Sequence, residues 1–249
     1  MNVVAGLTVS ALRRLDGEAR PYYRQALTTA CRKSPPVFGT RRYGDIYRAT
    51  AVNPYWMAIS LMMNAQREGE GAGQLWDLAV STPDESIAAR VRQHAIDESR
   101  HSRAYIALLD VAFPGAVDAE FHAELTTLSP GYTRHSPRDA HPDSPFARPI
   151  TVDDLIQMNI AEIRTLIHQR LQRPVLLAHC APERRGRLTR ILDVLLADEI
   201  RHIAYTATLV ENSARTGGAR EMTQLMQDRL SDFNAITLED LGRNVFEST

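Results

Sequence analysis

The amino-acid sequence predicts an all-α protein, and three observations carry this prediction. Apolar residues recur at helical spacing, whereas the alternation typical of strands is nearly absent. Capping and proline signals mark the starts of long segments with this spacing. A stretch rich in proline, histidine, serine and arginine, residues 129–149, separates these segments into two pairs. We therefore expect one helical domain over residues 1–249.

The first pair of helices is predicted at residues 54–80 and 83–113. The second of these begins at Thr82-Pro83-Asp84-Glu85, which offers a threonine N-cap, a proline at the first helical position and a glutamate three residues after the cap. It is expected to end at Pro114-Gly115, because proline and glycine interrupt helices. The two helices are joined by a tight turn and form an antiparallel hairpin.

The second hairpin is predicted at residues 151–180 and 182–214. Thr151-Val152-Asp153-Asp154 begins its first helix, and Ala181-Pro182-Glu183 begins its second. Two short helices before Cys31 and one after residue 218 are expected to pad the long helices.

Residues 129–149 are expected to form a long crossover without a core of its own. Whether this crossover is a lid over a pocket stays open at this point. Four long helices with a long central crossover correspond to the ferritin-like arrangement of a helical bundle.

Composition excludes several classes of protein. The chain has 249 residues, of which 44% are hydrophobic and 24% charged, and its 29 basic and 30 acidic residues leave a net charge of −1. A general nucleic-acid binder usually carries a basic excess. The two cysteines, Cys31 and Cys180, form no CxxC pair, which argues against a cysteine-ligated metal site and favours a reducing compartment. No apolar run reaches the roughly 18–20 residues that span a bilayer, and the N-terminus does not resemble a signal peptide. We expect a cytoplasmic protein without a membrane or nucleic-acid partner.

A repeated motif carries the chemistry. Asp97-Glu98-Ser99-Arg100-His101 and Asp198-Glu199-Ile200-Arg201-His202 both read D-E-x-R-H, and each lies in the second helix of its hairpin. Glutamate and histidine three residues apart share a helix face, so each motif offers a carboxylate and an imidazole to one point. A single E-x-x-H pair arises easily by chance, but two copies extended by the same Asp and Arg do not. Carboxylate and imidazole ligands suit iron or manganese.

A two-metal site in such a bundle also needs one glutamate from the first helix of each hairpin. In the second hairpin Glu162 is the only glutamate of that helix, and it lies about as far before the turn as Glu199 lies after it. In the first hairpin the candidates are Glu68 and Glu70. Glu68 lies about as far before the turn as Glu98 lies after it. It also lies on the same stripe as apolar residues of its own helix, so it is preferred as a ligand. Glu70 is expected to be outward or to support the ligands.

The glycines flanking these two candidates keep Glu70 open as a ligand. Gly69, Gly71 and Gly73 lower the helix propensity of this segment. They allow a local bulge or the close approach of another helix.

The other motif residues have a supporting role. A ligating histidine normally donates its second ring N–H to a carboxylate. Asp97 and Asp198 are placed to accept this bond, each from the histidine of the opposite hairpin. Arg100 and Arg201 can pair with these aspartates and offset the buried charge. The alternative is a plain Arg–Asp pair on the surface.

His94 lies four residues before Glu98 on the same stripe, where the other hairpin has Leu195. It is a candidate third histidine ligand, the alternative being a core histidine. Tyr105, one turn beyond His101, is expected either in the core or in a pocket beside the metals. The remaining histidines are expected to be solvent-exposed or structural: His122, His135, His141, His168 and His179.

With these residues the sequence resembles the ferritin-like di-iron carboxylate proteins, over about residues 53–79, 84–109, 153–179 and 187–209. The D-E-x-R-H form is similar to their oxygen-activating branch, which includes ribonucleotide reductase small subunits, acyl-carrier-protein desaturases and bacterial multicomponent monooxygenases. His94 is similar to the extra histidine of p-aminobenzoate N-oxygenases, although that family carries it in the second hairpin. Iron-storage ferritins fit less well, since they are shorter and lack two equivalent histidine motifs.

The resemblance implies a ligand set. Glu68, Glu98 and His101 would hold one iron, and Glu162, Glu199 and His202 the other. Glu98 and Glu199 would bridge the two ions, and His94 would add a nitrogen ligand. Manganese can replace one or both irons.

The resemblance also implies a function, the oxidation of a small organic substrate by O2, with N-oxygenation of an amine favoured. Glu98, Glu199 and Tyr105 would then lie beside the reacting atoms. A ferredoxin or reductase would supply electrons, and a homodimer is expected. Two alternatives stay open: iron oxidation and handling without an organic substrate, and a degenerate bundle that serves as a protein-binding module.

Overall fold

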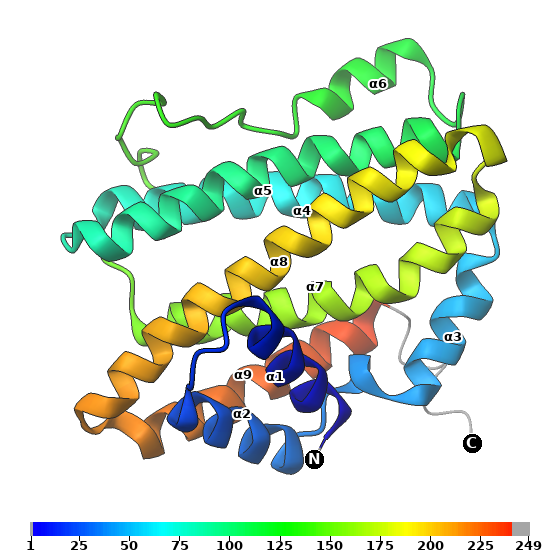
Figure 1. Cartoon of the computed structure of the whole chain (residues 1–249). Coiled ribbons are helices and arrows are strands. Elements are labelled where there is room, and N and C mark those ends of the chain that lie inside the picture. The colour runs from blue at the N-terminus through cyan, green and yellow to red at the C-terminus, as the bar shows by residue number, and fades with distance from the viewer. Residues whose placement is uncertain (1, 241–249) are drawn as a thin grey trace. The chain divides into compact units, whose positions relative to one another are not determined.

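The structure, a computed structural model, describes residues 2–240 and is all-helical, with no strand in that range (Figure 1). This confirms the predicted all-α class. The helices are α1 (Val3–Leu15), α2 (Pro21–Lys33), α3 (Arg41–Ala51), α4 (Pro54–Ser81), α5 (Glu85–Ala112), α6 (Ala119–Thr126), α7 (Val152–His179), α8 (Arg185–Ser213) and α9 (Ala219–Asp240). Shorter helical turns occupy Val37–Gly39, Pro182–Arg184 and Ala214–Gly218.

The chain divides into two compact units. Within the described residues, unit 1 contains 2–50, 151–172 and 196–240, and unit 2 contains 51–150 and 173–195. Helices α7 and α8 therefore contribute one part to each unit. That the two units form one domain stays a prediction.

In unit 2, α4 and α5 pack against each other as the predicted hairpin (Figure 1). Helix α4 begins after Asn53, whose side chain accepts hydrogen bonds from the backbone N–H groups of the first turn. The predicted start of α5 is wrong by two residues. Asp84 is its N-cap, and its carboxylate accepts the N–H groups of Ser86 and Ile87. Thr82 instead ends α4, because its hydroxyl donates to the carbonyl of Leu78.

In unit 1, a buried polar network fixes α7 against α8. The Asn159 side chain donates to the Ile203 carbonyl at 3.1 Å and to Thr206 Oγ1 at 2.9 Å. Thr206 in turn donates to the His202 carbonyl at 2.7 Å. The phenol of Tyr23, on α2, donates to Asn159 Oδ1 at 2.8 Å. Because every member is buried, these bonds hold the three helices in one register at the turn that carries His202.

Two short helices were not expected from the sequence. Helix α3 buries Tyr43 and Tyr47 together with the small residues Gly44 and Ala51, so the large side chains of its inward face are tyrosines rather than an aliphatic stripe. Helix α6 has an aspartate N-cap, Asp118, but buries only Leu125. Helices α1, α2 and α9 match the predicted accessory helices, except that Cys31 lies inside α2.

The crossover after α6 is irregular but docks on α4. The ring of Trp76 stacks on Tyr132 with centroids 4.4 Å apart, and its Nε1 donates to the Pro137 carbonyl. The buried carboxylate of Asp77 accepts the backbone N–H and the ring Nδ1–H of His141, both at 2.9 Å. The crossover is therefore fastened to the hairpin of unit 2.

Gly69 allows the chain to pass closely over α4 where the crossover begins. A Cβ atom at Gly69 would lie 2.0 Å from the carbonyl oxygen of Leu128. At Gly71 and Gly73 a Cβ would meet no atom within 4 Å. Of the three glycines, only Gly69 is required by close packing.

The contact between Asp77 and His141 predicts an acid-sensitive attachment of the crossover. Burial alone would raise the pKa of Asp77, but hydrogen bonds from Ser144 and His141 outweigh it and lower the pKa. A depressed pKa stabilises the fold at higher pH, and this contribution is lost as the pH falls through the lowered value. We expect the crossover to loosen below about pH 4, seen as a change in Trp76 fluorescence. Asp77→Asn should remove this transition, and an unchanged acid transition in that variant would contradict the assignment.

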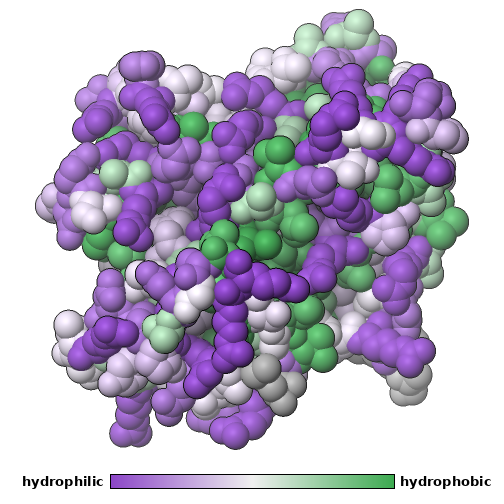
Figure 2. Space-filling model, viewed as in Figure 1, coloured by the Kyte–Doolittle hydropathy of each residue, from purple (hydrophilic) through white to green (hydrophobic). Residues whose placement is uncertain are grey.

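The face of the molecule in Figure 2 is mostly hydrophilic, with smaller apolar areas between the polar side chains. Among the described residues, no helix is both long and apolar enough to cross a membrane.

Candidate metal centre

The two D-E-x-R-H motifs lie on α5 and α8, and their ligand candidates are buried. Glu98, His101, Glu199 and His202 are all less than 5% exposed. A buried carboxylate is costly unless a positive group or a metal ion compensates it. We define half-site A, in unit 2, as Glu68, His94, Glu98 and His101. Half-site B, in unit 1, is Glu162, Glu199 and His202.

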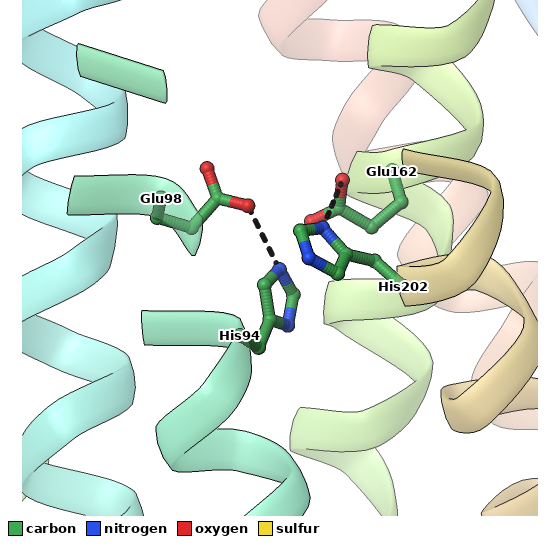
Figure 3. A group of neighbouring side chains, drawn as sticks. All are labelled: His94, Glu98, Glu162 and His202. Atoms are coloured by element: carbon green, nitrogen blue, oxygen red, sulfur yellow. Dashed lines mark hydrogen bonds and ion pairs between the residues drawn. The ribbon is translucent and has the colours of Figure 1, made fainter. Parts of the chain in front are cut away.

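In half-site A, one ligand atom each of Glu68, Glu98 and His101 lies within 4.8 Å of the others. The two oxygens of Glu98 face different imidazoles. Oε1 is hydrogen-bonded to His94 Nε2 at 2.9 Å (Figure 3), and Oε2 lies 3.4 Å from His101 Nδ1. Helix α5 produces this arrangement because residues at i, i+4 and i+7 share one face.

The structure separates the two glutamates that the sequence left as alternatives on α4. Glu68 is half-buried beside Glu98 and His101. Glu70 is exposed and accepts a hydrogen bond from Gln66 at 2.7 Å, on the outer face of the helix. This placement favours Glu68, whose role as a ligand stays a prediction.

In half-site B, His202 Nδ1 lies 3.8 Å from Oε2 of Glu162 and 3.8 Å from Oε2 of Glu199. Figure 3 shows the Glu162 carboxylate, on α7, facing the His202 ring, on α8. Helix α7 supplies a further residue that the sequence reading missed. The side-chain amide of Gln169 donates to Glu199 Oε1 at 2.7 Å. Its position seven residues after Glu162, on the same helix face, was the available signal.

The donor set fits a metal ion. Two ligands that each lie about 2.1 Å from one ion are separated by about 3.0–3.4 Å. The contacts of His101 with Glu98, and of His202 with its two glutamates, are 3.4–3.8 Å, longer than most hydrogen bonds and close to this separation. Carboxylate oxygens and imidazole nitrogens suit iron and manganese better than metals that prefer sulfur. The buried histidines and glutamates can therefore bind metal ions.

The aspartates and arginines of the motifs pair as expected. Arg100 donates to Asp97 Oδ1 at 2.8 Å, and Arg201 forms an ion pair with Asp198. Both aspartates are buried, whereas both guanidinium groups are about half exposed. Each arginine thus brings positive charge to a buried carboxylate from the surface. A bond from either aspartate to the histidine of the other hairpin stays a prediction.

Tyr105 is buried on α5, one turn after His101, and a role beside the reacting atoms stays a prediction. The five other histidines are structural or exposed. His168 stacks on Tyr43 and Tyr47, and its Nε2 lies 2.5 Å from the Tyr43 hydroxyl. His122 pairs with Asp110, and His141 pairs with Asp77. His179 donates to the Ala51 carbonyl, and His135 is exposed.

Comparison with protein-family models, with curated proteins and with solved structures finds no match to this chain.

Proposed function

We propose that this protein is a ferritin-like, non-haem di-iron oxygenase that uses O2 to oxidise a small organic substrate. One observation carries the proposal: the same D-E-x-R-H motif occurs twice, and each copy is buried beside a further glutamate. A lone cluster of this kind is compatible with many metal proteins. Two matched clusters are the pattern expected for two neighbouring ions.

The ligand roles follow from the two half-sites. Glu68, Glu98 and His101 would hold one iron, and Glu162, Glu199 and His202 the other. When bound, the iron pair supplies the electrons and the open positions that O2 activation requires. Manganese is compatible with the same donors.

The remaining residues of the chain prepare this site. His94 holds Oε1 of Glu98 and turns Oε2 towards His101. The Asp97–Arg100 and Asp198–Arg201 pairs compensate charge next to the ligands. Because Glu98, His101, Glu199 and His202 are almost fully buried, these ligands would be kept from bulk water, which strengthens the electrostatic interactions there.

The substrate class and the partners are proposed from the resemblance of the motif. The third histidine, His94, favours an amine as substrate. Inserting one oxygen atom of O2 into a substrate and releasing the other as water consumes two further electrons and two protons. A ferredoxin or reductase would supply these electrons. We propose a homodimer, as for the proteins it resembles.

Anaerobic titration of the metal-free protein with Fe²⁺, followed by exposure to O2, tests the proposed function. We expect binding to stop at two irons per chain, and O2 to be consumed with a transient visible absorption. Amines offered with a reductant should then be oxidised. Uptake far beyond two irons without such absorption would instead support iron handling and overturn the oxygenase proposal.

A further inference from the structure

Gln169 is a buried amide next to a proposed metal ligand, and the sequence motif does not include it. It is 3% exposed on α7, and its Nε2–H donates to Glu199 Oε1 at 2.7 Å. Its own oxygen is buried and has no hydrogen-bond partner among the described residues. A buried amide that keeps one polar atom unsatisfied is unfavourable unless its other bond is strong. The bond to a carboxylate is of the stronger, charge-assisted kind.

In half-site A, too, the two oxygens of a glutamate contact two different side chains. Glu98 uses Oε1 for His94 and directs Oε2 at His101. Glu199 uses Oε1 for Gln169 and directs Oε2 at His202. Although the two motifs share the D-E-x-R-H pattern, the groups that hold their glutamates therefore differ.

This difference has a chemical consequence for metal binding. An imidazole nitrogen is a good metal ligand. An amide NH2 group carries no available lone pair and acts only as a hydrogen-bond donor. The imidazole that holds Oε1 of Glu98 can therefore become a ligand if Nε2 gives up its proton, whereas the NH2 group that holds Oε1 of Glu199 cannot.

We propose that Gln169 is a positioning residue that holds Oε1 of Glu199 and so fixes this carboxylate with Oε2 directed at His202. The inference rests on the proposed function, because it requires half-site B to hold a metal.

Gln172 provides a matched control. It lies three residues after Gln169 on the same helix and is equally buried. Within residues 2–240 its side-chain oxygen also has no hydrogen-bond partner. Its neighbour is the Tyr47 phenol rather than a proposed ligand. Substituting methionine at either position removes an amide and keeps the length of the side chain. The Gln169 substitution removes the contact with Glu199, and the Gln172 substitution leaves it in place.

Titration of the metal-free proteins with Mn²⁺, followed by electron paramagnetic resonance of the unbound ion, tests the proposal. The wild type should bind two equivalents. Gln169→Met should weaken one of the two binding steps by about 10–100-fold and leave the other unchanged. Gln172→Met should leave both steps unchanged. The infrared carboxylate bands that change on Mn²⁺ addition should be altered in Gln169→Met and not in the control.

A second variant of Gln169 is included in case Gln169→Met does not fold. Gln169→Asn keeps the amide but withdraws it by one methylene from Glu199, so it should weaken the same binding step. Thermal unfolding of each metal-free variant identifies those that fold like the wild type. If both Gln169 variants fold and bind Mn²⁺ like the wild type, the positioning role is overturned and the proposed function stands. If the wild type binds no metal, the proposed function fails, and this inference fails with it.

Discussion

Replacing Glu98 by glutamine is expected to abolish metal binding in half-site A while the metal-free protein stays at least as stable as the wild type. Glu98 is the residue that joins Glu68, His94 and His101. A neutral amide is a poor metal ligand, yet it fills the same volume and removes a buried charge. Active sites often lower stability in this way, so loss of function and gain of stability should coincide.

The expected magnitudes are large. Metal content should fall from two ions per chain to one or none, as measured by elemental analysis. O2-dependent oxidation should fall by about a thousandfold, which corresponds to about 4 kcal/mol of lost transition-state stabilisation. Glu70→Gln is the matched control, because Glu70 is an exposed glutamate on α4. If Glu98→Gln and His202→Ala both leave the biological function of the protein intact although they remove the metal, a protein-binding module is supported instead.

Replacing Gly69 by alanine should destabilise the protein by about 1–3 kcal/mol, the usual cost of overpacking. The new methyl group would overlap the carbonyl of Leu128, and a backbone atom cannot move aside as the end of a side chain can. Gly73→Ala, one turn later on the same helix, should stabilise by about 0.5–1 kcal/mol, since it gains helix propensity without a clash. Urea denaturation of the two variants measures this difference in sign, and equal effects would show that the contact at Leu128 does not constrain α4.

The long helices could be predicted because their signals are local. The start of α5 was nevertheless misplaced, since Thr82 and Asp84 are both good N-cap residues and only the structure shows which one bonds the first turn. Helix α3 was missed because its buried face consists of tyrosines, which are common both inside and on the surface of proteins. The docking of the crossover depends on Trp76 and Tyr132, which lie far apart in sequence. No periodicity in the sequence reports such a pair.

The candidate site divides in the same way. Glu98 and His101, like Glu199 and His202, form a pattern within one helical turn, so spacing alone brings them together. Gln169 has no such pattern, because its partner Glu199 lies on another helix. Its spacing of seven residues from Glu162 places both on one face of α7, but this spacing does not report the contact with α8. The choice between Glu68 and Glu70 rested on helix faces, and the structure places these two residues accordingly.

The bond from Tyr23 to Asn159 changes how the N-terminal helices should be regarded. A shortened protein engineered to begin at Pro54 would retain every proposed ligand and all four long helices. It would also leave the side-chain oxygen of Asn159, Oδ1, without the hydrogen bond from Tyr23. Asn159 lies one turn before Glu162, and the loss would loosen the turn of α8 that carries His202. Helix α2, which the sequence presents only as an accessory helix, is therefore needed to hold the proposed ligands in place. A designer who reduces this chain to its ligand-bearing core would need to rebuild the contribution of Tyr23.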